Sequence, residues 1–438
     1  MRHHIHVIGA GVGGLTVAAL LGKNGHSVEI FEKMSKIGGR TASTTFRNHI
    51  LDNGFHIMPF YKKSAIFQIL KRLKIDSRLK LAKVDNIAFY SETGFHRYPK
   101  GIGDLLKLSL IPFSSRIRLL KILLPMAFTT MKKTEEWDNL SLTEITEKLD
   151  ANTKAFFEAV CMLAFADTAD HISLGEFART MIRANQFKGG TCEFAYPFDG
   201  GYDAISNVLQ DYVLDNGAKI NLNSQIKKIV IKNSEVKGTI THDDTFHPSN
   251  CVVVSLPAYH AINRLFDDNV FEQKFIDKVN RLNKTTAVVE VHFALNKKID
   301  SMQIVFPVGN FTTKGFFFIS NISPRVCPQG EHLMISGTPV LPEEAENPKK
   351  VRQIIQQMKN ELNAIYPDFE KSLIWERPMA WKLVESVAKE PGLVWKTKMS
   401  HEIPQVNGLF FVGDSTVSYG IGTDSAAHSS ILCHPKIE

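Results

Sequence analysis

The chain has 438 residues, of which 44% are hydrophobic and 22% charged, with a formal net charge of +7. This composition is typical of a folded protein of two or three domains. Five scattered cysteines without C-x-x-C spacing argue against a disulfide framework or a structural zinc site. No apolar run approaches the ~18–20 residues of a membrane span, and the first strand begins close to Met1. We therefore expect a cytoplasmic protein without a signal peptide.

The chain begins with a strand, a glycine-rich turn and a helix. Residues 5–8 predict a buried strand and residues 15–21 a helix, with Gly9, Gly11 and Gly14 between them in G-x-G-x-x-G spacing and Gly13 in the same turn. The first glycine permits the tight turn, the second lets a pyrophosphate approach the backbone, and the third lets helix and strand pack closely. The unpaired N–H groups at the helix start favour a phosphate there.

A second strand over residues 27–31 ends at Glu32, 18 residues beyond Gly14. This is close to the roughly 20 residues expected for an acid that accepts hydrogen bonds from ribose hydroxyls. A carboxylate here disfavours NADP, because it would face the 2′-phosphate. The unit predicts a dinucleotide site and leaves NAD and FAD open.

Residues 100–133 form a basic segment that holds seven Lys or Arg residues against Asp104 alone. The segment is also rich in large aliphatic residues, which is typical of a surface that contacts an anionic membrane. The alternative is a helical subdomain with an ordinary core. Pro112 and Pro125 interrupt the pattern, so we expect no long amphipathic helix. Nucleic acid is disfavoured, because the cations alternate with aliphatic rather than stackable aromatic residues.

The rest of the chain alternates between helical and strand-like patterns. Residues 98–197 are mostly helical, and a helix over 202–214 precedes a small meander of strands over 219–222, 227–231 and 236–241. Residues 251–255 predict a buried parallel strand. Residues 286–345 predict an antiparallel sheet, followed by a helix over 349–365, a strand over 409–412 and a helix from Ser425.

Four blocks carry a resemblance to a known family. Gly38-Gly39-Arg40 follows the acid, Asp52-x-Gly54 comes soon after, residues 196–201 read YPFDGG, and residues 408–414 read GLFFVGD. With the glycine turn, these blocks resemble the FAD-dependent amine oxidase and phytoene desaturase superfamily, which includes protoporphyrinogen oxidases. The resemblance spans residues 5 to about 430 and implies FAD as the cofactor.

The resemblance also implies the fold and its domains. The expected class is α/β, with a Rossmann-like FAD-binding domain of the glutathione-reductase type and an α+β substrate domain built on an antiparallel sheet. Residues 1–75, 198–285 and 401–438 would form the FAD-binding domain, 76–97 and 286–400 the substrate-binding domain, and 98–197 a helical lobe that is a candidate for contact with the inner face of a membrane.

The implied cofactor site combines the glycine turn with the later blocks. Asp414 would contact the ribityl or pyrophosphate part, Arg40 the phosphates, and Ile226 the adenine through its backbone. The N-terminus of the helix from Ser425 would stabilise charge at the flavin pyrimidine edge, with Asp424 capping that helix and pointing away. The expected FAD contacts are Gly9, Gly11, Gly13, Gly14, Glu32, Lys33, Gly39, Arg40, Thr41, Gly54, Phe55, His56, Ile226, Gly413, Asp414, Gly422, Thr423 and Asp424.

Two residues are candidates for substrate contact. His56 can accept a proton near neutral pH, although packing or a phosphate contact explains it equally well, and Tyr419 would form one wall of an aromatic cage with no identified second wall. His3, His4 and His6 suggest metal ligands, but they alternate along a terminal strand, so we expect no metal there.

The first hypothesis is an FAD-dependent oxidoreductase that desaturates a lipophilic, isoprenoid- or carotenoid-like substrate. The second is an amine oxidase or protoporphyrinogen-type oxidase, with oxygen or a quinone as electron acceptor. The third is a non-catalytic or redox-neutral lipid-binding protein, such as an isomerase or a relative of prenyl-binding escort proteins.

Overall fold

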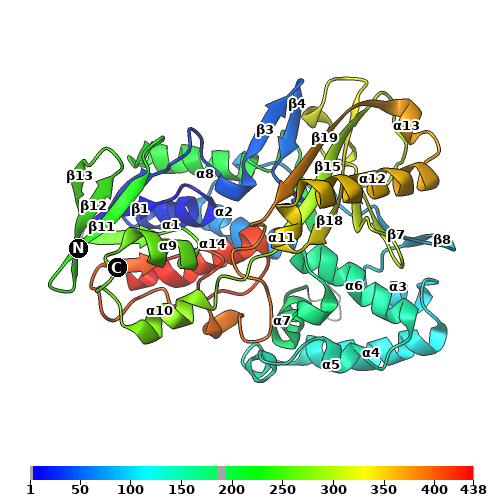
Figure 1. Cartoon of the computed structure of the whole chain (residues 1–438), viewed down its shortest axis with the longest axis horizontal. Helices are drawn as coiled ribbons and strands as arrows, with labels where there is room; N and C mark the ends of the chain where they lie inside the picture. The colour runs from blue at the N-terminus through cyan, green and yellow to red at the C-terminus, as the bar shows by residue number, and fades with distance from the viewer. Residues whose placement is uncertain (1–2, 185–192, 438) are drawn as a thin grey trace.

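The computed structural model describes residues 3–184 and 193–437, so part of the predicted helical lobe, residues 185–192, lies outside the described residues. A parallel sheet forms one half of the molecule (Figure 1). Its order is β10-β2-β1-β14-β20, and every neighbouring pair is parallel. The strands are β1 (His4–Ile8), β2 (Ser27–Phe31), β10 (Lys219–Asn221), β14 (Cys251–Val254) and β20 (Leu409–Phe411). The sheet thus joins segments from both ends and the middle of the chain.

Helices and a small meander cover this sheet. α1 (Val12–Lys23) packs against α8 (Ala204–Asp215) and α14 (Gly422–Cys433), and α14 packs against α2 (Ala65–Leu73) (Figure 1). The predicted meander was wrong in one strand, because β10 joins the edge of the parallel sheet instead. The meander consists of β11 (Ile226–Lys232), β12 (Glu235–Thr241) and β13 (Phe246–Pro248).

A seven-stranded sheet forms the core of the other half. Its order is β19-β15-β18-β17-β16-β7-β8. The predicted antiparallel sheet is correct except at one pair, because β16 and β7 run parallel. α12 (Pro348–Ile365) covers one face and buries Met358 and Leu362 in a cluster with Phe293 and Phe316. The strands are β7 (Ile87–Ser91), β8 (Gly94–Arg97), β15 (Ala287–Leu295), β16 (Ile304–Pro307), β17 (Gly315–Phe317), β18 (His332–Val340) and β19 (Leu373–Trp381).

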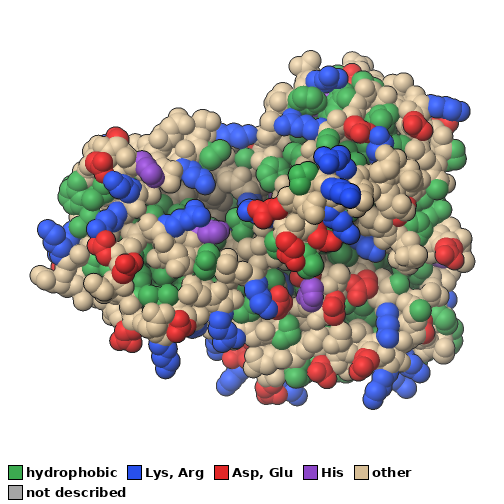
Figure 2. Space-filling model, viewed as in Figure 1, with side chains coloured by type: hydrophobic (Ala, Val, Ile, Leu, Met, Phe, Trp, Pro, Cys, Tyr) green, Lys and Arg blue, Asp and Glu red, His purple; other side chains and the backbone are tan. Residues whose placement is uncertain are grey.

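Helices α3 (Ile102–Lys107), α4 (Phe113–Phe128), α5 (Thr143–Thr146), α6 (Ala151–Phe165) and α7 (Leu174–Ala184) lie below that sheet (Figure 1). The prediction that Pro125 interrupts the helical pattern was wrong, since α4 continues through it to Phe128. On the face drawn in Figure 2, Lys and Arg side chains over α4 and α5 are interspersed with Asp and Glu. Among the described helices, none is long and apolar enough to cross a bilayer.

Shorter elements connect these layers. Segments 198–285 and 401–438, which the sequence assigns to the FAD-binding domain, supply strands to the parallel sheet. The exact domain boundaries stay a prediction. The remaining strands and helices are β3 (Ser43–Phe46), β4 (His49–Asp52), β5 (Met58–Pro59), β6 (Leu81–Val84), β9 (Phe194–Pro197), α9 (Ala258–Leu265), α10 (Gln273–Asn280), α11 (Pro342–Ala345) and α13 (Phe369–Ser372).

Candidate functional site

The glycine turn connects β1 to α1 with three different demands. Gly9 has a φ of +99°, which L-residues rarely adopt. A Cβ on Gly14 would lie 1.9 Å from the Gly9 carbonyl oxygen, so this position admits no side chain. A Cβ on Gly11 would meet only the Gly38 carbonyl oxygen, at 4.0 Å. Gly9 and Gly14 therefore shape the turn, whereas Gly11 leaves open space in front of it.

That space belongs to a cavity of about 940 Å³, which extends from the glycine turn to the helices below the seven-stranded sheet. Its polar end contains Gly11, Gly13, Gly39 and backbone at the ends of the parallel strands. Its apolar end is lined by Phe55, Phe156, Phe157, Phe177, Met181 and Phe317. The open space before Gly11 and the cavity volume fit a dinucleotide with a second, apolar molecule beside it.

Glu32 lies at the end of β2 and is buried beside the turn. Its carboxylate accepts hydrogen bonds from the backbone N–H groups of Ala10, at 2.8 Å, and Met34, at 2.9 Å. It also lines the cavity together with Lys33 and Ile226. Glu32 and Ile226, which the sequence assigns to the ribose and the adenine, therefore line the same cavity, and Lys33 lines it with them.

Arg40 and Asp414 form an ion pair in the cavity wall. The guanidinium donates two hydrogen bonds to the carboxylate, at 2.8 and 2.7 Å. Burial raises the pKa of Asp414, but the Arg40 charge, the Arg40 hydrogen bonds and the nearby Lys389 together outweigh burial and hold that pKa well below its usual range. Both residues line the cavity. Arg40 also donates to the Val384 carbonyl oxygen, at 2.8 Å. It therefore has protein partners where the sequence predicts a phosphate.

Helix α14 begins at Gly422, three residues earlier than the sequence predicts, with Ile421 as its N-cap. Asp424 does not cap the helix. Its buried carboxylate instead accepts the Ala65 N–H, at 2.5 Å, and pairs with Arg183. It is absent from the cavity lining, whereas Ile421, Gly422 and Thr423 line the cavity. The helix start therefore faces the cavity, and Asp424 points away from it as expected.

The two candidate substrate contacts lie in different places. His56 lines the cavity, stacks on Tyr202 with ring centroids 4.7 Å apart, and keeps a buried Nδ1 without a hydrogen-bond partner in the described part of the chain. Burial lowers the pKa of this imidazole. Tyr419 packs against Trp395 and His428 and is not among the cavity-lining residues. The structure therefore brings His56, but not Tyr419, to the cavity.

The other expected contacts divide in the same way. Gly9, Thr41, Phe55 and Gly413 line the cavity, whereas Gly14 and Gly54 are not among its lining residues. As cofactor contacts these residues stay predictions.

Sequence reasoning missed two buried charged residues that fix the cavity wall, of which Glu385 also lines the cavity. Glu385, buried and outside any motif, accepts the N–H of Gly422, at 2.8 Å, and so fixes the start of α14. Lys398 is also buried and donates to the Asp414 carbonyl oxygen, at 2.9 Å. Burial and the nearby Lys389 lower the pKa of Lys398 to about 7. Hydropathy gives no signal for such residues, because charged side chains in irregular segments are expected to be exposed.

The flavin containing amine oxidoreductase family matches residues 12–433. The chain belongs to this family. FAD is its cofactor, as the sequence predicts, and the resemblance to the amine oxidase and phytoene desaturase superfamily is confirmed.

Individual relatives are distant from this chain. It is 22% identical to the 4,4′-diapophytoene desaturase of Methylomonas sp., over 68% of this chain and 62% of that enzyme. It is 22% identical to the 15-cis-phytoene desaturase of Solanum lycopersicum, over 99% of this chain and 77% of that one. The matches span 53%, 62% and 66% of the first three curated relatives.

The fold matches that of an oxidoreductase from Methanosarcina mazei. That structure superimposes with a TM-score of 0.80 at 21% identity, covering 98% of this chain and 99% of the other. The likeness establishes the shared α/β architecture over the full length of the chain.

Proposed function

We propose that the protein is an FAD-dependent oxidoreductase that removes hydride from a lipophilic, isoprenoid-like substrate. The observation that carries the proposal is the apolar end of the cavity, which belongs to the same cavity as the dinucleotide turn and is walled by Phe156, Phe157 and Phe177. Two of the relatives are named as a 4,4′-diapophytoene desaturase and a 15-cis-phytoene desaturase. An extended hydrocarbon gains most of its binding free energy from such a wall, at about 25 cal/mol per Å² of apolar surface removed from water.

The residues at the polar end are suited to hold FAD. The glycine turn leaves room for the pyrophosphate at the start of α1, and Glu32 lies where a ribose would be held. When bound, FAD supplies a two-electron hydride acceptor. The protein then has to hold a C–H bond close to that acceptor and exclude water from it. Apolar walls serve both purposes without an acid or a nucleophile.

His56 is the polar group best placed to act beside the substrate. Because burial lowers its pKa, the imidazole is neutral at pH 7 and its unpartnered Nδ1 is available as an acceptor or donor. In this proposal His56 accepts the proton that leaves a substrate carbon as the hydride departs, or orients a polar substituent on that carbon. A protonated imidazole would not repel a hydrocarbon or FAD. It would, however, have no nitrogen lone pair with which to accept the proton.

Contact with an anionic membrane surface is part of the same proposal. α4 buries Leu123 toward the cavity and exposes Phe113 and Phe128, which are 65% and 57% accessible. The exposed face also carries Arg118 and Lys121. Aromatic side chains flanked by cations favour the headgroup region of a bilayer. A lipophilic substrate could then enter the cavity from the lipid phase across one helix.

The test is an anaerobic titration of the purified, flavin-loaded protein with polyenes, porphyrinogens and amines, followed at the visible flavin bands. We expect a polyene to bleach the flavin. Val160→Trp, which fills part of the apolar end, should slow bleaching at least tenfold while leaving FAD content unchanged. Asn152→Trp adds the same side chain to the exposed face of α6 and serves as the matched control.

Other outcomes separate the alternatives. Bleaching by an amine or a porphyrinogen alone would replace the polyene proposal with the oxidase hypothesis. A bound flavin that changes with none of these compounds, while the protein still binds polyenes, would favour redox-neutral lipid binding. Equal bleaching rates in the Val160→Trp and Asn152→Trp variants would place the substrate outside this cavity.

A further inference from the structure

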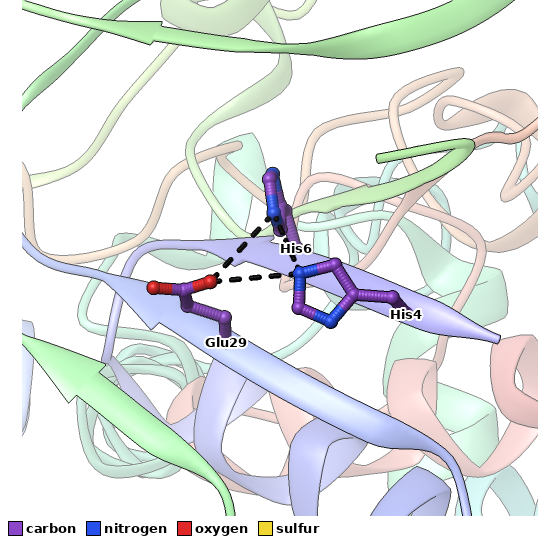
Figure 3. A group of neighbouring side chains, drawn as sticks. All are labelled: His4, His6 and Glu29. Atoms are coloured by element: carbon purple, nitrogen blue, oxygen red, sulfur yellow. Dashed lines mark hydrogen bonds and ion pairs between the residues drawn. The ribbon is translucent and has the colours of Figure 1, made fainter. Parts of the chain in front are cut away.

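Three side chains on the parallel sheet converge on one point outside the cavity. His4 and His6 alternate along β1 and share a face, and Glu29 lies directly opposite His6 on the parallel neighbour β2. Figure 3 shows the three side chains pointing toward one another. Their nearest ligand atoms all lie within 4.8 Å. None of the three lines the FAD cavity.

The separations match those around a bound metal ion. His4 Nε2 and His6 Nε2 are 3.3 Å apart, and Glu29 Oε2 lies 3.6 Å from the first and 3.9 Å from the second. The circle through the corners of a triangle with these sides has a radius of about 2.1 Å, so a single point is that far from all three atoms. Zinc binds imidazole nitrogen and carboxylate oxygen at about 2.0–2.2 Å.

The outer atoms of these side chains are held by further contacts. His6 Nδ1 bonds to Thr239 Oγ1, at 3.1 Å, and His4 Nδ1 to Ser27 Oγ, at 3.3 Å. Asn221 donates to Glu29 Oε1, at 2.9 Å. Such contacts orient ligand rings, and here they direct both Nε2 atoms and Glu29 Oε2 inward, where these three atoms make polar contacts only with one another among the described residues.

We propose that His4, His6 and Glu29 bind one divalent transition-metal ion, of which Zn²⁺ is the best-fitting example. Two imidazoles and one carboxylate suit zinc and its first-row neighbours, whereas Mg²⁺ and Ca²⁺ prefer oxygen ligands. The His4 side chain is 47% accessible, so water completes the coordination from that side. The ion joins β1 to β2 beneath the meander, two strands that both lead into the FAD site.

The sequence alone predicts no metal here, because only two of the three ligands lie close together in the chain. Histidines at alternate positions of a terminal strand supply only two ligands on one face, since His3 points to the other face and stacks on His26. The third ligand comes from a strand more than twenty residues later. The pairing of β1 with β2 is what completes the set.

The test is calorimetric titration of tag-free, chelator-treated, FAD-loaded full-length protein with ZnCl₂. We expect one Zn²⁺ per chain, no comparable binding of Mg²⁺, and at least tenfold weaker zinc binding in His4→Ala and Glu29→Gln. His3→Ala is the matched control and should bind zinc as the wild type does. His4 is exposed, so its replacement leaves the sheet core intact, and the flavin spectrum verifies folding in every variant.

Two results would overturn the proposal. One is the absence of stoichiometric zinc binding to the wild-type protein. The other is unchanged zinc affinity in both His4→Ala and Glu29→Gln, which would assign the ion to other histidines. Neither result depends on catalytic activity, so the site stands or falls separately from the proposed oxidoreductase function.

Discussion

Two substitutions three residues apart in the glycine turn should separate folding from cofactor binding. In Gly14→Ala the new Cβ would lie 1.9 Å from the Gly9 carbonyl oxygen, whereas real Cβ contacts stay beyond 3.0 Å. Both atoms belong to closely packed backbone, so the turn has to open. We expect destabilisation toward the upper end of the ~1–3 kcal/mol that overpacking costs.

Gly11→Ala should behave in the opposite way. Its backbone φ of −76° and ψ of 179° suit alanine, and the added methyl meets only the Gly38 carbonyl oxygen, at 4.0 Å. The stability of the flavin-free protein should therefore change by less than about 0.5 kcal/mol. The methyl enters the space reserved for the pyrophosphate, so FAD affinity should fall at least tenfold, equivalent to about 1.4 kcal/mol.

The assay pairs denaturant unfolding of flavin-free protein with FAD titration followed by flavin fluorescence. We expect opposite results for the two variants. Gly14→Ala should be destabilised, whereas Gly11→Ala should be as stable as the wild type but bind FAD weakly. Wild-type FAD affinity in Gly11→Ala would mean that the cofactor does not approach this backbone. Wild-type stability in Gly14→Ala would mean that the turn is looser than the 1.9 Å separation implies.

Three further predictions concern charge and surface. Glu32→Gln should lower FAD affinity about tenfold in the same titration, because the carboxylate that accepts the Ala10 and Met34 N–H groups, and that the sequence predicts to bind the ribose, becomes neutral. Unchanged affinity would limit Glu32 to a structural role. Burial and Lys389 lower the pKa of Lys398 to about 7 in the folded protein. Between pH 7 and about 10 the Lys398 side chain is therefore protonated in the unfolded chain but neutral in the folded one. The free energy of unfolding should consequently rise with pH, by up to about 1.4 kcal/mol per pH unit. Denaturant unfolding from pH 7.5 to 9.5 should show this slope reduced in Lys398→Met, and equal slopes would contradict it. The double variant Phe113→Ser, Phe128→Ser should no longer co-sediment with phosphatidylserine vesicles, while its flavin content stays unchanged. If the double variant co-sedimented as well as the wild type, α4 would not be part of the proposed membrane surface.

The dinucleotide half could be predicted closely because its determinants are local. The glycines, the strand before them and Glu32 lie within one unit, so spacing alone predicts the turn and its acid. The boundaries of β1, β2 and β14 agree with the predicted strands to within one residue. Hydrophobic runs of this kind indicate buried parallel strands without reference to any distant residue.

The other half depended on pairings that the sequence does not display. β10 has the same alternation as a meander strand, and only its pairing with β2 makes it an edge of the parallel sheet. The residue type of Asp424 and its place in the sequence predict a helix cap. Its carboxylate instead binds Arg183 and the Ala65 N–H, two partners that are distant in sequence. Tyr419 is near α14 in sequence, yet its ring packs on Trp395 and His428 and does not line the cavity.

The same contrast explains why the cofactor is easier to identify than the substrate. FAD is recognised largely through backbone positions, and a backbone that must approach a ligand requires glycine at fixed spacing. A hydrocarbon requires only apolar surface of the right length, which Phe, Met and Val supply interchangeably from α6, α7 and the seven-stranded sheet. Many sequences therefore give equivalent walls, and no motif results. The residues that set substrate choice should accordingly be found by altering cavity length, as in Val160→Trp, rather than by altering the turn.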